Sequence, residues 1–386
     1  MMLMMPALKY DEGLVEDLLA VSLGGLDSLL RALARPPERY YIRVNLLKTT
    51  PEAVMEAARS AGIELRRDEV LDYALWAPVK GPFRIDATSK VVVADKRAAE
   101  SVYVGSDLYG PGVLKAEGVK KGDYVTVVTP DGIPVANGVA AMDWREMTKR
   151  PPGVAVKVTN SVYMAPKIRD IPGFDRGLFY SQSYPSMWVA ELASPKRGQT
   201  IIDMNAAPGG KVSHVAQMTG PYARIIAFDR PSKVDKLVES LGRLGITWVE
   251  VHGADSREAS RVLGRVEFAD LVLIDPPCTN LGVIPKLSDS KTLNDAANLA
   301  SYQFQFIVEA WRLLKPGGLL AYSTCTITDV ENEFNVARAA ELGFEPVRPD
   351  RVPPGARATD LGVRFDVERG FPGFFISLLR KPGAPK

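Results

Sequence analysis

Residues 200–212 read Thr-Ile-Ile-Asp-Met-Asn-Ala-Ala-Pro-Gly-Gly-Lys-Val, a short apolar run that leads through a glycine turn into a helical stretch. Glycines at such a turn let the backbone approach a ligand, and the start of the following helix directs free N–H groups toward it. Further candidate strands lie at 225–229, 248–252, 271–274 and 319–323, and a helix is expected over 299–314 before Lys315-Pro316-Gly317-Gly318. Strands that alternate with helices predict an α/β fold with a doubly wound, mainly parallel sheet of Rossmann-like type.

Acidic residues stand at the ends of the first three candidate strands. Asp203 closes the first, Asp229 closes the second, and Asp255 follows the third. An acid about 20 residues after the glycine turn can accept both hydroxyls of a ribose, and Asp255 is placed to meet an adenine edge. Acids at strand ends are also common for structural reasons such as helix capping.

The glycine turn itself limits the class of ligand. It matches neither the dinucleotide fingerprint Gly-x-Gly-x-x-Gly nor a phosphate loop ending in Gly-Lys-Ser/Thr. A nucleoside without a pyrophosphate fits better, which favours S-adenosylmethionine as cofactor. The predicted cofactor-binding residues are Asn205, Ala206, Ala207, Pro208, Gly209, Gly210, Lys211, Asp229, Asp255 and Asp275.

Two smaller regions precede this sheet. Residues 1–88 are expected to form an α+β region, with helical spacing over 11–35 broken at Gly24-Gly25, strands at 40–46 and 63–65, and a helix that begins at Pro51 after Thr50. Residues 89–164 contain β-branched runs at 91–93, 102–104, 125–128 and 154–158 between Gly, Pro and Asp, which predicts a compact β-barrel-like module. Composition leaves open whether this module is a spacer or binds a partner. Residues 165–386 carry the α/β sheet.

Composition is that of an ordinary soluble protein, with 46% hydrophobic and 24% charged residues. A net charge of +2 gives no global sign of a nucleic-acid partner. Six basic residues and one acid, Glu146, lie between Arg145 and Arg169, which is either a solvated face or a phosphate-binding stripe. The apolar run Met1 to Met5 is too short to span a bilayer and lacks the features of a signal peptide, so we expect a cytoplasmic protein without membrane contact.

Only two cysteines occur, in Asp275-Pro276-Pro277-Cys278 and Ser323-Thr324-Cys325-Thr326, each directly after an apolar run. Two thiols build no disulfide framework, and no metal-ligand spacing is present, so no metal is expected. Free cysteine is commonly a small buried core residue, but these flanking motifs favour a chemical role. His214 falls on a predicted helix and His252 in a predicted strand, and neither is expected to be catalytic.

These motifs resemble the Sun-type RNA cytosine-5 methyltransferases in residues, order and strand-end context. The resemblance rests on residues 202–211, 275–278 and 322–326 and on Glu331-Asn332-Glu333. Residues 179–187 resemble the segment before the cofactor strand of that family, and Arg43-Val44-Asn45 resembles the start of its N-terminal RNA-positioning subdomain.

The middle module is similar to a PUA domain, an RNA-binding fold. The similarity is carried by residues 104–113 and by Lys121-Gly122-Asp123. A PUA module at this place in the chain is the arrangement of a tRNA-modifying subgroup whose members methylate a cytosine near the 3′ end of the acceptor stem. The resemblance therefore implies an S-adenosylmethionine-dependent methyltransferase that acts on RNA, above all on tRNA. We expect a monomer.

The resemblance also implies a role for four side chains. C5 of cytosine is a poor nucleophile, and addition of a thiolate to C6 converts the ring to an enamine that can accept a methyl group at C5. Cys325 is expected to supply that thiolate, and Cys278 to assist release of the C5 proton. Asp275 is expected to recognise the N3/N4 edge of the base, and Lys211 to fix the active-site side chains or the base.

RNA contacts are expected mainly on the middle module, where basic side chains would hold register without reading sequence. Any one of these lysines can equally be a solvated surface residue. The candidates are Tyr109, Gly110, Lys115, Lys120, Lys121, Lys149, Arg150 and Lys157.

The sequence departs from the usual family pattern at several positions. Met204-Asn205 stands where Leu-Cys is common, and Pro276 replaces an alanine in the first cysteine motif. Thr279 and Thr326 replace serines, Asn280 replaces a glycine, and Ile284 replaces an arginine that could contact RNA.

Three alternatives stay open beside the tRNA enzyme. One is a ribosomal RNA cytosine-5 methyltransferase. Another is an amino-group methyltransferase, whose Asp-Pro-Pro motif is followed by an aromatic residue and which has no use for Cys325. The third is an RNA-binding protein with a catalytic half that is only scaffold, against which the intact thiols, Asp275 and glycine turn argue.

Overall fold

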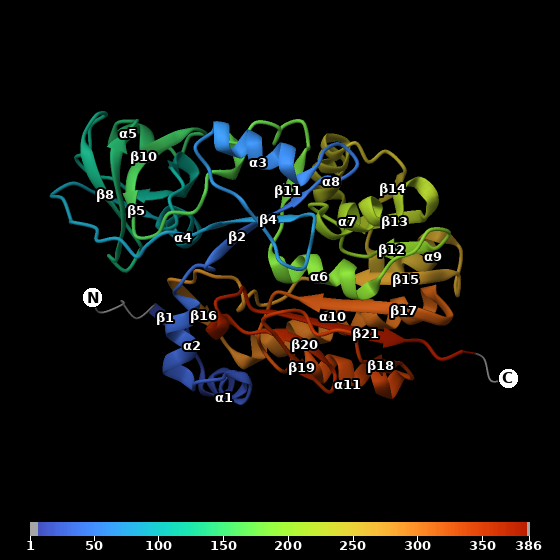
Figure 1. The fold of residues 1–386 in the computed structure, drawn as a ribbon. Coiled ribbons are helices and arrows are strands. Elements are labelled where there is room, and N and C mark those ends of the chain that lie inside the picture. Colours follow the sequence, from blue (N-terminus) through green and yellow to red (C-terminus); the bar gives the residue numbers. More distant parts are fainter. Residues whose placement is uncertain (1–6, 384–386) are drawn as a thin grey trace.

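A nine-stranded sheet forms the largest part of the computed structural model, which describes residues 7–383 (Figure 1). Its strand order is β14-β13-β12-β15-β17-β21-β20-β19, and β18 pairs with β21. Parallel pairing joins β12 (Thr200–Asp203), β13 (Arg224–Asp229), β14 (Val249–Gly253), β15 (Ala269–Ile274) and β17 (Leu314–Thr324). The predicted α/β, doubly wound, mainly parallel fold is confirmed.

The order of the parallel strands reverses at β12, which lies between β13 and β15. Ligands of open α/β sheets bind at the carboxyl ends of the strands beside such a switch point. The remaining strands, β18 (Glu345–Val347), β19 (Ala356–Thr359), β20 (Gly362–Phe365) and β21 (Phe374–Arg380), extend the sheet by antiparallel pairing.

Helices cover both faces of this sheet because the apolar side chains of its strands point alternately to either side. Ile201 and Leu271 pack with α6 (Tyr184–Ala193), α7 (Gly210–Thr219) and α8 (Pro231–Leu244). Ile202 and Val272 pack on the other face with α9 (Ala259–Leu263), α10 (Leu293–Leu313) and α11 (Glu333–Leu342). The two buried layers fix the carboxyl ends of the central strands in space.

Two predicted boundaries in this region are wrong. α10 begins at Leu293 rather than 299, because Thr292 and Asp295 form a reciprocal capping box at its start. β17 begins at Leu314 and includes the predicted turn 315–318, where the register against β15 shifts between Ala269 and Leu271.

A four-stranded sheet of order β11-β2-β4-β3 lies next to α7, and its strands are β2 (Arg39–Val44), β3 (Arg66–Arg67), β4 (Ala74–Pro78) and β11 (Phe179–Ser181). The predicted helix α3 (Pro51–Ser60) starts after Thr50, whose hydroxyl accepts the Ala53 N–H. The predicted strand 63–65 is wrong: Ile63 and Leu65 instead pack into the core beneath α3, and the strand follows at Arg66.

The β-rich module stands at one end of the molecule (Figure 1). Its six-stranded sheet contains β5 (Val91–Ala94), β6 (Leu108–Tyr109), β7 (Val113–Lys115), β8 (Tyr124–Val128), β9 (Pro134–Ala140) and β10 (Val154–Ser161), and α5 (Trp144–Met147) follows β9. The run 102–104 is not a strand: residues 96–103 form α4, whose N-cap Asp95 accepts the Ala98 N–H at 2.9 Å. Helical spacing buries Ala99, Val102 and Tyr103 together.

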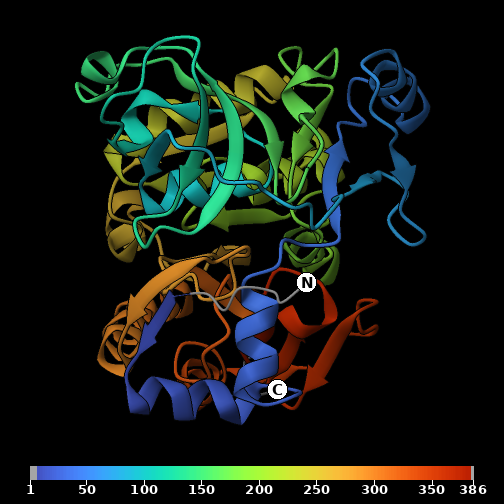
Figure 2. The ribbon, with the colours of Figure 1, turned by 90° about the vertical axis from the view of Figure 1, so that its left-hand side faces the viewer.

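The first helices pack against the large sheet region, as Figure 2 shows. α1 (Glu12–Val21) and α2 (Leu26–Leu33) share a buried cluster with Leu281, Ile327 and Val367. β1 (Ala7–Tyr10) pairs in parallel with β16 (Ser288–Lys291). The run Met1 to Met5 lies outside the described residues, and no helix within 7–383 is long and apolar enough to cross a membrane. The division at residues 88/89 and 164/165 stays a prediction.

Candidate active site

The glycine turn after β12 forms one wall of a cavity of about 210 Å³. Gly209 caps α7 with φ = +113°, a conformation that glycine adopts without strain. Asp229 stabilises the turn, because its Oδ2 accepts the Ala207 N–H at 2.9 Å. The lining residues are Tyr180, Ser181, Gln182, Ser183, Ser186, Asn205, Ala206, Ala207, Pro208, Gly210, Lys211 and Asp275.

Most of the predicted cofactor residues thus meet at one cavity, and three do not line it. Gly209 belongs to the glycine turn and Asp229 accepts a hydrogen bond from it, and Asp229 is almost fully buried. Asp255 lies elsewhere: Arg257 donates to it through Nε at 3.0 and 3.1 Å and through Nη2, which lowers the pKa of its carboxyl. A role for Asp255 at an adenine edge stays a prediction.

Two buried oxygens beside this cavity fit a ligand with positive charge and hydrogen-bond donors. The Oδ2 of Asp203 and the Oδ1 of Asn205 have no hydrogen-bond partner among residues 7–383. Burial raises the pKa of Asp203 to about 7, because the loss of water outweighs the Asn205 N–H and the Lys211 cation, which act in the opposite direction. The ammonium and sulfonium groups of S-adenosylmethionine have the complementary charge, and the start of α7 suits its anionic carboxylate.

The two thiols meet just beyond the carboxyl ends of β15 and β17. Cys278 Sγ lies 3.3 Å from Cys325 Sγ, with Cys278 buried and Cys325 partly exposed. Asn280 Oδ1 accepts from Cys325 at 3.0 Å. The hydrogen bond with Cys325, together with burial, raises the pKa of the Cys278 thiol well above its ordinary value. Cys278 is therefore a neutral thiol in the resting protein.

Asn280 explains one departure from the family pattern. Its φ of +57° lies in the left-handed region, where glycine is the usual residue and asparagine is the best-tolerated alternative. The side chain gained in exchange reaches both thiols, with Cys278 Sγ at 3.6 Å from its Oδ1.

An ion pair places Lys211 and Asp275 together, as expected from the sequence. Lys211 Nζ, from the first turn of α7, lies 2.5 Å from Asp275 Oδ2. Asp275 follows β15, and its Oδ1 accepts from Ser323 Oγ at 3.4 Å. The carboxylate is held by two neighbouring elements while almost a third of its side chain stays exposed, so it can meet a base edge.

Glu331 is a functional residue to which the sequence analysis gave no role. Its carboxylate is fully buried and accepts from Thr279 N at 2.9 Å, Gln303 Nε2 at 2.8 Å and Thr328 Oγ1 at 2.9 Å, and from the Thr279 hydroxyl. Thr279 Oγ1 also lies 2.6 Å from Thr326 Oγ1. One carboxylate thus joins the segments that follow the two cysteines. In the sequence, the motif Glu331-Asn332-Glu333 was the feature that could have pointed to Glu331.

Arg43 connects the small sheet to the cofactor turn. It is fully buried on β2 and donates to Gln182 Oε1 at 2.7 Å, Gly210 O at 2.7 Å and Ser213 Oγ at 2.6 Å. Burial lowers its pKa to about 9, which leaves it charged at neutral pH. Both ring nitrogens of the neighbouring His214 are buried without a partner among the described residues, and burial lowers its pKa, so it stays neutral.

The predicted RNA-contacting residues do not share one environment. Tyr109 is 55% exposed, and Lys115, Lys120, Lys121, Lys149 and Lys157 are exposed as well. Arg150 instead donates through Nε to Pro111 O at 2.7 Å. Gly110 is buried so close to Pro151 O that a Cβ would lie 2.2 Å from it, so no side chain fits at this position. Within residues 7–383, no group of His, Cys, Asp and Glu is arranged to hold a metal ion.

Several known proteins resemble this chain in sequence and in fold. The pattern of the family described as 16S rRNA methyltransferase RsmB/F matches residues 190–342, and that of the PUA domain matches residues 90–162. The tRNA (cytosine(72)-C(5))-methyltransferase of Pyrococcus horikoshii is 39% identical, with 92% of each chain covered. The chain belongs to the Sun family of RNA cytosine-5 methyltransferases.

Two further relatives agree with this membership. The crystal structure of NSun6 from Pyrococcus horikoshii, solved with the S-adenosylmethionine analogue SFG, superposes with a TM-score of 0.88 at 37% identity and covers 97% of this chain and 99% of that one. The mouse tRNA (cytosine(72)-C(5))-methyltransferase NSUN6 is 28% identical, with 84% of this chain and 76% of that protein covered. This Sun-family protein is therefore an S-adenosylmethionine-dependent RNA cytosine-5 methyltransferase with an RNA-binding PUA domain.

Proposed function

We propose that this enzyme methylates C5 of cytosine 72 in tRNA, near the 3′ end of the acceptor stem. Two full-length relatives, one archaeal and one mammalian, carry this activity in their names, and both span the PUA region as well as the sheet. The observation that carries the chemistry is the pair of thiols 3.3 Å apart, on the two strand ends that also place Asp275.

Cys325 is the proposed nucleophile. Its partly exposed thiol gives up its proton to solvent, the sulfur bonds to C6 of the target cytosine, and the displaced C5=C6 electron pair makes C5 electron-rich. Asp275, held by Lys211, hydrogen-bonds the N3/N4 edge of the base and stabilises charge that develops at N3. When bound, S-adenosylmethionine supplies the methyl group that C5 accepts.

Cys278 completes the proposed cycle. Once Cys325 is bonded to C6, the thiol contact that contributes most to the raised pKa of Cys278 is removed. Cys278 then gives up its own proton to solvent and its thiolate takes the C5 proton. The C5–H electron pair re-forms the C5=C6 bond, and the bond from Cys325 to C6 breaks with its electron pair leaving on the Cys325 sulfur. The resting pair thus keeps the base in its neutral form until the nucleophile has reacted.

The same enzyme chemistry could act on ribosomal RNA, as the name of the matching family pattern indicates. The Bacillus subtilis probable ribosomal RNA small subunit methyltransferase B is 34% identical, but the match covers only 54% of this chain and 49% of that protein. That shorter match leaves the PUA region unexplained, and tRNA is therefore the proposed substrate. We also propose a monomer, because one chain carries every group of the site. The cytoplasmic location stays a prediction.

The test is labelled methyl transfer to tRNA and to ribosomal RNA, followed by mapping of the product. We expect 5-methylcytosine at position 72 of tRNA, and no labelling of a tRNA that carries uridine there. Methylation confined to ribosomal RNA, or to another tRNA position, would overturn the proposed substrate while leaving the chemistry intact.

A further inference from the structure

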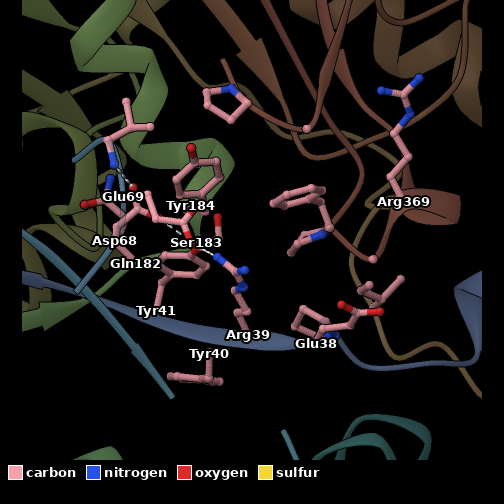
Figure 3. Close-up of a pocket in the computed structure, with 18 of the residues that line it drawn as sticks. Glu38, Arg39, Tyr40, Tyr41, Asp68, Glu69, Gln182, Ser183, Tyr184 and Arg369 are labelled. Carbon is pink, nitrogen blue, oxygen red and sulfur yellow. Dashed lines mark hydrogen bonds between the residues drawn. The ribbon is translucent and has the colours of Figure 1, made fainter. Parts of the chain in front are cut away.

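A second hollow of about 430 Å³ adjoins the cofactor cavity (Figure 3). Ser181, Gln182 and Ser183 line both, so the two spaces share a wall. None of Cys278, Cys325, Lys211 and Asp275 lines the second hollow, and the catalytic cycle leaves it without a role. Its other lining residues come from 37–41, 68–70, Tyr184, Ile284, 354–355 and 369–372.

Aromatic side chains line much of this second hollow. Tyr41 and Tyr184 have ring centroids 5.0 Å apart, and Tyr184 and Phe371 stack at 5.7 Å with 28° between their planes. Tyr40 is only partly buried, and its hydroxyl lies 2.9 Å from Ser181 Oγ on the shared wall. Ring faces at the edge of a hollow are the surfaces on which unstacked nucleobases pack.

The charges at the rim suit the edge of a base better than a phosphate. Arg39 and Arg369 supply donors, and Glu38, Asp68 and Glu69 supply carboxylate acceptors (Figure 3). The acids outnumber the cations, so a phosphate would meet repulsion, whereas amino and carbonyl groups of a base find both kinds of partner. Arg39 lies over the Trp76 ring at 4.2 Å, and Arg369 is exposed with only a loose contact of 3.8 Å to Asp366.

We infer that this hollow holds a nucleobase next to the target cytosine, taken out of the RNA stack together with it. The inference rests on the proposed action on RNA and names where the substrate continues beyond the catalytic cavity. The target base must leave its stack to reach Cys325, at a cost of a few kcal/mol. Stacking of its neighbour on Phe371 offsets part of that cost, and the shared wall keeps the two bases on adjacent sites.

The test combines a protein change with an RNA change. Phe371→Leu removes a ring but keeps an apolar side chain, and RNA substrates carry one abasic nucleotide on the 5′ or the 3′ side of the mapped methylation site. Phe334→Leu is the matched control, because Phe334 is an exposed ring on α11 that does not line the hollow. The KM and kcat of all combinations are measured.

With intact RNA, Phe371→Leu is expected to raise KM by about tenfold and to leave kcat nearly unchanged, since stacking on one ring is a binding term. For the wild type, one abasic position should raise KM by a similar factor. The same abasic RNA should raise the KM of the Phe371→Leu variant by less than twofold, because the ring on which the missing base would stack is already absent. Phe334→Leu should behave as the wild type does.

The inference would be overturned if the effects of Phe371→Leu and of the abasic nucleotide on KM were additive at both neighbouring positions. It would also be overturned if the wild type had an unchanged KM for both abasic substrates. Arg369→Ala provides a second variant at the exposed rim, where loss of folding is not expected, and should show the same coupling to the same abasic position. The RNA used is whichever one the mapping shows to be methylated. A different methylated position would therefore refute the proposed substrate without deciding this test.

Discussion

Replacing Glu331 should loosen both thiol segments at once. Glu331→Ala takes the acceptor away from the Thr279 backbone N–H and from one side-chain Nε2–H of Gln303. Neither N–H group can act as an acceptor itself. Each orphaned buried donor costs about 1–3 kcal/mol, and loss of one side of a buried charged network costs about 3–5 kcal/mol. We expect the free energy of unfolding to fall by roughly 3–5 kcal/mol.

Glu331→Gln should cost much less. The amide oxygen can occupy the position of Oε1, which faces the two obligatory donors. The amide nitrogen then replaces Oε2, which faces only the hydroxyls of Thr279 and Thr328, and hydroxyls can rotate to accept. Neutral hydrogen bonds replace charge-assisted ones, so a loss of about 1–2 kcal/mol is expected.

The catalytic effect separates this role from a purely structural one. Misplacement of a reacting group by about 1 Å can cost on the order of 100-fold, so kcat of Glu331→Ala should fall by roughly 10- to 100-fold. Glu309→Ala is the control: Glu309 is also buried and accepts from Ser260 N and Arg312, but it contacts neither thiol segment.

Guanidinium unfolding and single-turnover methylation provide the two measurements. Glu309→Ala should lose stability and keep kcat, whereas Glu331→Ala should lose both. A stability loss below about 1 kcal/mol in Glu331→Ala, or equal kcat in the two variants, would refute the network argument.

Three further perturbations have defined outcomes. The pKa of Asp203 is raised to about 7 from an unfolded value of 3.8, so its neutral form stabilises the fold below pH 4, and that stability is lost as pH rises to 7. The free energy of unfolding of the wild type should fall by up to about 4 kcal/mol between pH 4 and pH 7, and Asp203→Asn should remove this fall. The measurement is the difference between the wild-type and variant unfolding curves. Arg43→Met removes the guanidinium donors from Gln182 Oε1, Gly210 O and Ser213 Oγ and should destabilise by about 3 kcal/mol in urea unfolding, and unchanged stability would show that the buried cation is not needed. The thiol oxidant diamide should join the two cysteines and abolish activity until a reductant is added, while a mass spectrum with two free thiols after treatment would contradict their 3.3 Å proximity.

Much of the catalytic half could be predicted because its signals are local. A strand, a glycine turn and a helix follow one another within 200–219, and each cysteine motif directly follows its own strand. Parallel strands bring such ends to one edge of the sheet, so Cys278, Cys325, Asp275 and Lys211 meet there although 114 positions of sequence separate the outermost two, Lys211 and Cys325.

The contacts that were not predicted from the sequence are tertiary. Arg43 and Gly210 are brought together only when the small sheet docks on α7, and nothing in the local sequence of either reveals this. The partners of Glu331 come from three separate segments, and the motif alone gave no clue to which groups it would bind. Asp255 has a local partner that was not predicted: Arg257, two residues later, donates to its carboxylate, and the predicted ligand contact stays a prediction.

The run 102–104 was misread for a related reason. Val102 has a β-branched side chain, but Asp95 caps a helix at the right distance upstream, and burial of Ala99, Val102 and Tyr103 on one helical face outweighs the weak strand preference. The N-caps Asp95 and Thr292, which the sequence-based prediction did not use, mark where both misplaced helices begin.

The covalent mechanism is tested most directly by trapping the enzyme on its RNA. Cys278→Ala, Cys325→Ala and the double variant are incubated with S-adenosylmethionine and labelled tRNA, then run on a denaturing gel. We expect an RNA–protein adduct that persists in Cys278→Ala, because proton release is blocked after methyl transfer, and that is absent from Cys325→Ala and from the double variant. An adduct that survives in Cys325→Ala, or full methylation by that variant, would contradict the assignment of Cys325 as the nucleophile.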